Sequence, residues 1–316
     1  MASTLEYPSA LKVRPLTGSI GAEVFGVDFS REIPDDVAEE IRQAFYHHFV
    51  LVFRGDRQPG QEEQNRLAAL FGEPETIPLL AALGVEQTAI TLQAGLKVAG
   101  SEDGLMLETA YTAYKAELQN IGIAGEFDGW HSDSTFTPWF HRVAVLRSPV
   151  IAPVGGDTSF ASLCAAWDGL SPTVQRWLSD LRAVHMIPLG LKEGINVAGY
   201  GKEIEQRFDD AFPPREQPMV VLHPETGRKV LFLNPSDCVH IVGLKRAESH
   251  ALLRFLAHHV ASASFTYRHH WQPGDLVLWD ELTVLHRAPD DYAPHAREVV
   301  RITAGRVVPT AAPADC

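Results

Sequence analysis

Short runs of β-branched and aromatic residues recur along the chain, and several are bounded by turn-forming residues. Such runs are typical of β-strands, whose pleated surface suits these side chains. Pro273-Gly274-Asp275 directly precedes one of the runs and indicates a turn. The predicted strands span residues 49–53, 143–145, 230–233, 265–267, 276–279 and 299–302.

Helical patterns are fewer. Residues 35–48 place Val37, Ile41 and Phe45 on one apolar stripe. Ser171 followed by Pro172 is typical of a helix start, because serine caps the first turn and proline suits its first position. The predicted helices span residues 35–48, 62–71, 171–181 and 248–259. The pattern therefore predicts a mainly β fold with flanking helices, built as a closed or double-sheet structure.

The 316 residues, 45% of them hydrophobic, are enough to bury a substantial core. No repeat or convincing linker interrupts the chain, so we predict a single domain over residues 1–308. The Ala- and Pro-rich residues 309–316 are predicted to be a disordered tail.

The net charge of −13 argues against a general partner that is itself anionic, such as nucleic acid or a membrane surface. A local arginine cluster still allows a small anionic substrate. Cys164, Cys238 and Cys316 are too widely spaced for a disulfide framework or a CxxC metal site. Neither a signal peptide nor a transmembrane run is visible, so we expect a cytoplasmic protein.

Candidate chemistry lies in the run Trp130-His131-Ser132-Asp133. His131 and Asp133 are two residues apart, so on an extended segment their side chains point the same way. Two histidines and one carboxylate hold non-haem Fe(II) on one face and leave the opposite face open. His286 is the best third ligand, because Arg297 and Arg301 follow it on a strand-like segment. An open iron site beside a permanent cation suits an anionic co-substrate that binds both.

Other ligands remain possible. His269 and His270 are the nearest rivals to His286, although they lack downstream arginines at a useful spacing. Glu126 or Asp128 could replace Asp133, but neither stands two residues from His131. The remaining histidines are expected to be structural or solvated.

Several motifs, in this order, resemble the Fe(II)/2-oxoglutarate-dependent dioxygenases of the taurine dioxygenase / 2,4-D dioxygenase type. The resemblance runs from about residue 12 to residue 308. The matching motifs are residues 16–24, residues 50–55, Trp130-His131-Ser132-Asp133, Gly155-Gly156-Asp157-Thr158, Gly274-Asp275 leading to Trp279-Asp280, and His286 with Arg297 and Arg301.

The resemblance implies a distorted jelly roll (double-stranded β-helix) that holds Fe(II) and uses 2-oxoglutarate and O2 as co-substrates. It implies metal ligands at His131, Asp133 and His286. Thr158 and Arg297 match the positions that bind the far carboxylate of 2-oxoglutarate, where Arg297 supplies a bidentate, permanently charged donor. The family also implies that the glycine-containing segment at about residues 74–127 is a mobile substrate lid, against the alternative of a surface excursion with no role.

Arg301 lies four residues after Arg297, on the same face of a strand and roughly 13 Å away. In the taurine branch the matching arginine holds the substrate's sulfonate, so we predict that Arg301 binds an anionic substrate group. Alternatively, it pairs with an internal carboxylate or assists 2-oxoglutarate. Phe127 and Phe136 offer aromatic contact area to an apolar substrate body, or are simply core residues. Phe127 stands where the taurine enzymes carry asparagine, which argues against taurine itself.

The predicted function is oxidation of an unactivated C–H bond of a small organic anion, of the aryloxyalkanoate, alkylsulfonate or alkylsulfate type, with release of succinate and CO2. A biosynthetic hydroxylase or desaturase of an amino-acid-like acid is the main alternative. A non-catalytic 2-oxoglutarate-binding protein and a hydrolytic zinc enzyme are further alternatives. We expect a homo-oligomer, as is common in the family, and no nucleic-acid or membrane partner.

Overall fold

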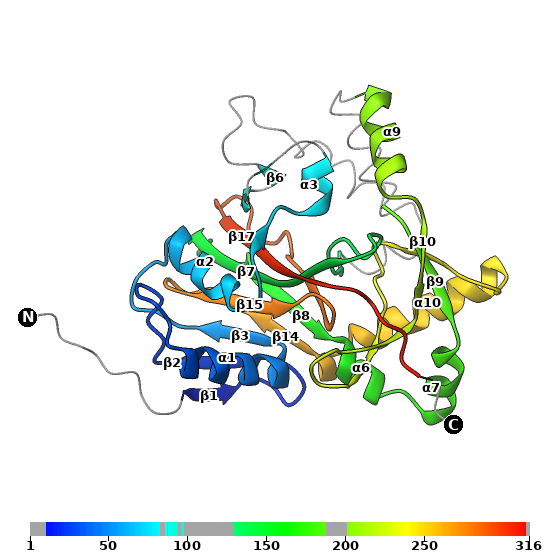
Figure 1. The fold of residues 1–316 in the computed structure, drawn as a ribbon, viewed down its shortest axis with the longest axis horizontal. Coiled ribbons are helices and arrows are strands. Elements are labelled where there is room, and N and C mark those ends of the chain that lie inside the picture. Colours follow the sequence, from blue (N-terminus) through cyan, green and yellow to red (C-terminus); the bar gives the residue numbers. More distant parts are fainter. Residues whose placement is uncertain are drawn as a thin grey trace, which may run out of the picture.

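A computed structural model describes residues 11–82, 86, 88–93, 96–97, 129–187 and 201–313. Its largest feature is a nine-stranded sheet, antiparallel except where β2 pairs with β3 (Figure 1). The path through this sheet is β1 (Lys12–Pro15), β2 (Ala22–Phe25), β3 (Val50–Phe53), β15 (Leu276–Asp280), β7 (Phe140–Val150), β17 (Glu298–Val307), β5 (Ala89–Gln93) and β6 (Leu96–Lys97), with β4 (Pro74–Glu75) also on β17.

A smaller antiparallel sheet carries much of the candidate chemistry. Its order is β14 (Thr266–His269), β8 (Thr158–Ser162) and β16 (Val284–Arg287). Two further groups complete the β structure: β10 (Arg215–Pro218), β9 (Arg182–His185) and β13 (Cys238–Ile241), and then β11 (Val220–Leu222) with β12 (Lys229–Leu231). The predicted mainly β class is confirmed.

The alternation of side chains along β3 divides the core into two parts. Leu51 and Phe53 join a cluster with α1 (Asp35–His48) and α2 (Gln61–Ala69), which cover one face of the large sheet. Val50 and Val52 point the other way, into the larger cluster shared with the small sheet. Successive strand residues face opposite sides of a sheet, so both faces of β3 are buried.

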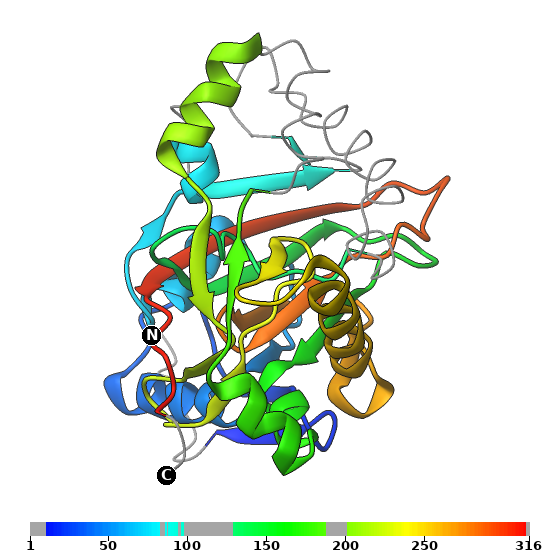
Figure 2. The same cartoon turned by 90° about the vertical axis from the view of Figure 1, so that its right-hand side faces the viewer.

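The two sheets face each other across this larger cluster. Trp279 of β15 lies with its ring centroid 5.5 Å from that of Phe160 on β8, and both side chains are fully buried. Helices α6 (Leu163–Asp168) and α10 (Arg246–Val260) add apolar side chains to the same cluster. Figure 2 shows the course of α10, in gold, along one side of the molecule. The remaining described helices are α3 (Pro78–Ala82), α7 (Pro172–Ser179), α9 (Gly201–Ala211) and the 3-10 helix η1 (Ala263–Phe265).

The first predicted helix has the bounds expected of it, Asp35–His48, because its apolar stripe packs on the sheet. Ser171 caps α7 as predicted, with its side chain accepting a hydrogen bond from the Val174 amide. β7 and β17 are much longer than the predicted runs. They pair with each other over most of their length, so polar residues such as His141 and Arg306 are also held in the sheet.

The predicted disordered tail differs from the structure at its start. The Leu222 amide donates to the Thr310 carbonyl, and the Ala312 amide donates to the Val220 carbonyl, so the chain pairs with β11 there. Ala312 is buried, which gives this stretch an apolar anchor. Residues 314–316 lie outside the described part of the chain. So does most of the predicted lid, including residues 98–128.

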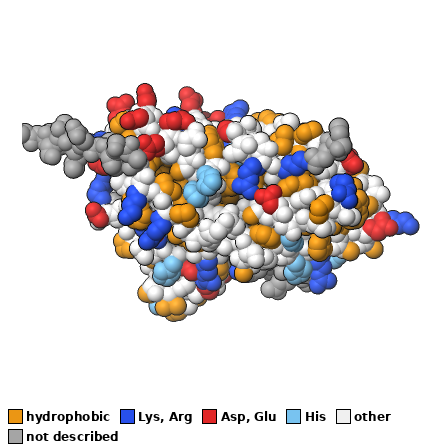
Figure 3. All heavy atoms as spheres, turned by 90° about the horizontal axis from the view of Figure 1, so that it is seen from below, with side chains coloured by type: hydrophobic (Ala, Val, Ile, Leu, Met, Phe, Trp, Pro, Cys, Tyr) orange, Lys and Arg blue, Asp and Glu red, His pale blue; other side chains and the backbone are white. Residues whose placement is uncertain are grey.

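Within the described ranges, no helix is both long and apolar enough to cross a membrane. On the face shown in Figure 3, side chains of both signs are interspersed among uncharged and hydrophobic ones.

The turn before β15 requires glycine, and this gives a test of the fold. The Asp275 amide donates to the Gln272 carbonyl, and Gly274 has φ +92°, as the third position of a type II turn demands. A Cβ on Gly274 would lie 2.1 Å from the Gly55 carbonyl oxygen. We expect Gly274→Ala to lower the free energy of unfolding by about 2 kcal/mol or more in chemical denaturation.

The control is Gly18→Ala, because a Cβ there meets no atom within 4 Å. It should change stability by less than about 0.5 kcal/mol. Equal effects of the two substitutions would contradict the close approach of Gly274 to Gly55.

Candidate active site

His131 and His286 are brought together by the backbone. The two residues form an isolated antiparallel bridge, in which the His131 amide donates to the His286 carbonyl at 3.0 Å and the His286 amide donates back at 2.7 Å. Their ring centroids are 4.3 Å apart. Because β16 is itself paired with β8, the bridge adds the His131 segment to the outer edge of the small sheet.

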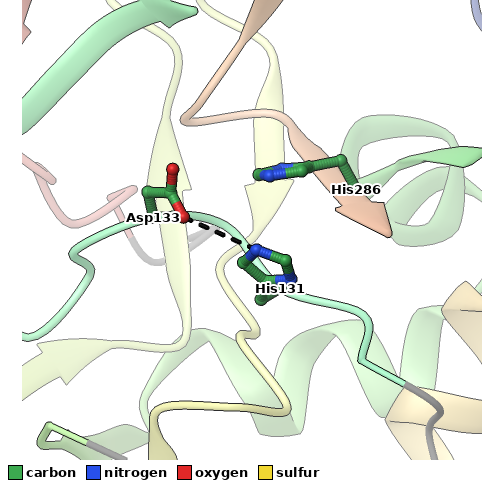
Figure 4. Close-up of side chains that lie close together, drawn as sticks. All are labelled: His131, Asp133 and His286. Atoms are coloured by element: carbon green, nitrogen blue, oxygen red, sulfur yellow. Dashed lines mark ion pairs between the residues drawn. The ribbon is translucent and has the colours of Figure 1, made fainter. Parts of the chain in front are cut away.

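Asp133 completes the cluster from the turn that follows (Figure 4). Its Oδ1 atom lies 3.6 Å from Nε2 of His131. One ligand atom from each of His131, Asp133 and His286 lies within 4.8 Å of the others. The turn is tight, since Ser134 has φ 60°, a conformation that non-glycine residues rarely adopt. The predicted three residues thus come together.

The surroundings keep both imidazoles in the form that binds metals. Burial lowers the pKa of His131 to about 4 and that of His286 well below its ordinary value. The Gly129 carbonyl lies 2.7 Å from Nδ1 of His131, so a proton on Nδ1 leaves the Nε2 lone pair directed at the cluster. His286 Nδ1 is buried without a hydrogen-bond partner among the described residues. The donor set fits a divalent metal with affinity for nitrogen and oxygen.

A buried polar network supports the turn that carries Asp133. The Thr135 hydroxyl donates to Asp237 Oδ2 at 2.8 Å and accepts from Asn234 Nδ2 at 2.9 Å. Asn234 also donates to the Ser132 carbonyl at 2.6 Å. Burial raises the pKa of Asp237 to about 7, so near neutral pH this carboxyl is close to its midpoint.

Thr158 and Arg297 also meet. Arg297 Nε donates to the Gly156 carbonyl at 2.7 Å, and Nη2 lies 3.4 Å from the Thr158 hydroxyl. Gly156 has φ +71°, and a Cβ there would lie 2.9 Å from Arg297 Cδ, so only glycine permits the approach. The arrangement leaves hydroxyl and guanidinium donors side by side, as an anionic carboxylate requires.

Arg301 lies at the metal-ligand cluster itself. The guanidinium forms an ion pair with Asp133 and a second one with Glu281, whose Oε1 is 2.8 Å from Nη2. Arg301 is buried, and burial lowers its pKa to about 9. Burial also raises the pKa of Glu281, and its ion pair with Arg301 opposes this rise by favouring the carboxylate. The two ion pairs match the alternative in which Arg301 pairs with internal carboxylates; its role in binding substrate stays a prediction.

The chain is similar to known proteins. Residues 12–303 match the family described as "Taurine catabolism dioxygenase TauD, TfdA family". The chain belongs to this family. The family predicted from the motifs is thereby confirmed, as is the class of enzyme, a dioxygenase and thus an oxidoreductase.

Three relatives show what this chain is similar to. An alkylsulfatase of Acinetobacter baylyi is 31% identical and the match covers 99% of this chain and 90% of the relative. An alpha-ketoglutarate-dependent sulfate ester dioxygenase of Pseudomonas putida is 30% identical over 97% of this chain and 93% of the relative. An alpha-ketoglutarate-dependent 2,4-dichlorophenoxyacetate dioxygenase of Cupriavidus pinatubonensis is 33% identical over 92% and 96%.

Solved structures of the family resemble the fold described above. A taurine dioxygenase from Burkholderia xenovorans superposes with a TM-score of 0.72 at 28% identity and covers 95% of this chain and 92% of that one. A structure described as AAD-2 in complex with Mn(II) and N-oxalylglycine has a TM-score of 0.70 at 25% identity, over 95% of this chain and 99% of that one.

Of the two aromatic residues predicted to contact the substrate, the structure describes one. Phe136 is buried, with its ring 5.5 Å from that of Phe212, which supports the alternative that it is a core residue. Phe127 lies outside the described residues. The rival ligands His269 and His270 are engaged elsewhere, since His269 pairs with Asp275 and His270 with Asp157.

Sequence reasoning missed Glu281 and the Asn234–Asp237 network. Glu281 follows the quoted Trp279-Asp280 motif directly, and a charged residue at the end of a buried strand was a usable signal. Asn234 and Asp237 are about 100 residues from the turn they support and carry no motif. Their contribution depends on long-range folding.

The raised pKa of Asp237 predicts a pH-dependent stability difference. In this TauD/TfdA-family protein the pKa of Asp237 is about 7 in the folded state, while an unfolded aspartate has its ordinary pKa of 3.8. Wild-type stability from this group is therefore present below the unfolded pKa and is lost as pH rises through 7. We expect Asp237→Asn to become more stable relative to wild type between pH 5 and pH 7, by at most about 1.4 kcal/mol per pH unit.

Urea denaturation at several pH values measures this difference. Asp168→Asn is the matched control, because it removes an exposed carboxylate that pairs with Arg228, and its difference from wild type should vary little with pH. A flat profile for Asp237→Asn would contradict the buried, protonated carboxyl.

Proposed function

We propose that this protein is an Fe(II)- and 2-oxoglutarate-dependent dioxygenase that oxidises an unactivated C–H bond of a small organic anion and releases succinate and CO2. The observation that carries the proposal is the cluster of His131, Asp133 and His286. Beside it, Thr158 on β8 is paired with Arg297, the residue directly before β17. When bound, Fe(II), 2-oxoglutarate and O2 supply the oxidising chemistry.

The proposed metal ligands are His131, Asp133 and His286. Two neutral imidazoles and one carboxylate leave a bound Fe(II) with a net charge of about +1 and open positions for other ligands. The bridge between the two histidines fixes the spacing of their rings before metal binds. Such preorganisation lowers the cost of assembling the site.

The proposed co-substrate clamp is Arg297 with Thr158. The planar guanidinium binds a carboxylate through two parallel hydrogen bonds, and the Thr158 hydroxyl, which also accepts from Trp271 Nε1 at 3.1 Å, adds one donor. Arg297 is oriented through its Nε atom by the Gly156 carbonyl. These residues hold the far carboxylate and so direct the opposite end of the molecule at the metal.

The proposed substrate class is a sulfate ester or an aryloxyalkanoate. The relatives named above act, by name, on alkyl sulfates, sulfate esters and 2,4-dichlorophenoxyacetate. Further parts of the proposal are that the two facing sheets form a distorted jelly roll, that the enzyme works in the cytoplasm, and that it assembles as a homo-oligomer.

The function is tested by aerobic incubation of the Fe(II)-loaded protein with 2-oxoglutarate and a panel of alkyl sulfates, sulfonates and aryloxyacids. We expect stoichiometric succinate and oxidised substrate with at least one anion. Oxidation without loss of sulfate or phenol would instead favour the biosynthetic alternative. No succinate with or without any substrate would contradict the proposed function.

Removal of any proposed metal ligand tests the metal site. His131→Ala, Asp133→Ala and His286→Ala each leave two protein ligands, so we expect each to weaken binding of Mn(II), measured by equilibrium dialysis, by about 100-fold or more and to abolish turnover. His270→Ala is the matched control, because His270 is an exposed partner of Asp157. If His286→Ala kept normal activity while His270→Ala lost it, the assignment of His286 as the third ligand would be wrong.

Substitution of Arg297 or Thr158 tests the co-substrate clamp. Arg297→Ala leaves the far carboxylate of 2-oxoglutarate without its charged partner, and we expect a loss of about 2–4 kcal/mol in 2-oxoglutarate binding. Thr158→Val removes one neutral donor and should cost about 1 kcal/mol. Calorimetric titration of the Mn(II)-loaded protein measures both, and an unchanged affinity in Arg297→Ala rejects the assignment.

A further inference from the structure

Glu281 is a buried carboxylate beside the metal-ligand cluster, and four neighbouring groups are placed to donate hydrogen bonds to it. Its Oε1 accepts from Arg301 Nη2 at 2.8 Å and from Trp279 Nε1 at 3.0 Å. Its Oε2 accepts from the Asp133 amide at 3.2 Å and lies 3.3 Å from the Ser132 hydroxyl. One side chain therefore joins the ligand turn to β17.

Arg301 has two acidic partners, and one of them is the carboxylate of the metal-ligand cluster. The guanidinium pairs with both Asp133 and Glu281. A divalent cation held by His131, Asp133 and His286 would draw on the same Asp133 carboxylate and repel the guanidinium. A buried arginine that loses its counter-ion is strongly destabilising, so Arg301 then depends on Glu281.

We propose that Glu281 is a positioning residue that keeps Arg301 paired and in place when Asp133 binds the metal. Without Glu281, the metal and Arg301 would share Asp133 as their single carboxylate. Glu281 adds a second negative charge to this buried centre. It thereby reduces competition between the guanidinium and the metal for Asp133. The inference rests on the proposed metal site and adds a residue to it.

The inference predicts that the effect of Glu281 on metal affinity depends on Arg301. We expect Glu281→Gln to raise the Kd for Mn(II), measured by equilibrium dialysis without co-substrate, by about tenfold or more. In an Arg301→Gln background the same change should alter the Kd by less than about threefold, because no cation is left to compete for Asp133.

A matched pair of variants separates charge from shape. Glu281→Asp and Glu281→Asn shorten the side chain equally, and only the first keeps the charge, so Glu281→Asn should bind Mn(II) about tenfold more weakly than Glu281→Asp. This pair also gives the result if Glu281→Gln does not fold. Glu23→Gln is the distant control: Glu23 is a buried carboxylate paired with Arg54, and its loss should leave the Kd unchanged.

Three outcomes would overturn the inference. They are an unchanged Kd in Glu281→Gln, an equal loss in the wild-type and Arg301→Gln backgrounds, and equal affinities of Glu281→Asp and Glu281→Asn. Failure of the proposed function would give a different result. In that case His131→Ala and the wild-type protein would bind Mn(II) with the same Kd.

Discussion

The short antiparallel bridge between His131 and His286 is the interaction on which the rest of the site depends. It consists of two backbone hydrogen bonds, so the side chains meet whatever else surrounds them. β16 is held in turn by β8, which lies between β14 and β16 and packs through Phe160 on Trp279 of the large sheet. The chemistry is thus carried by the edge of a small sheet that a larger sheet supports.

The two sheets divide the work between them. The small sheet supplies Thr158 and His286, while β17 of the large sheet supplies Arg301 and follows directly on Arg297. One cation at their junction faces two carboxylates, since Arg301 contacts both Asp133 and Glu281. Buried charges of this kind require partners, and removing one partner costs more than the pair contributes. We infer that metal binding and the arrangement of these side chains are coupled.

Much of this could be predicted from the sequence, for identifiable reasons. His131 and Asp133 are close in the chain, and the spacing of Arg297 and Arg301 after His286 is a local pattern, so both were visible without a structure. The helix over Asp35–His48 follows from its apolar stripe. Pairing of Arg301 with an internal carboxylate was considered as an alternative, but the two carboxylates were not identified. A spacing of four on a strand fixes the face of the sheet but not which residues lie opposite it. The buried network around Asp237 depends on contacts across about 100 residues, which no local pattern reports.

The length of β7 and the ordered start of the tail were underestimated for a related reason. Polar residues in these segments are held by pairing with neighbouring strands, and their own side chains do not favour the extended conformation strongly. Pairing is a property of the whole sheet.

We propose that His131, Asp133 and His286 hold a metal to which 2-oxoglutarate binds directly. Anaerobic addition of Fe(II) and then 2-oxoglutarate tests this without any knowledge of the substrate. We predict a visible metal-to-ligand charge-transfer band that appears only with both additions and saturates at one equivalent of each. A protein that binds Fe(II) and 2-oxoglutarate without developing the band would contradict direct chelation, and one that binds neither would contradict the metal site itself.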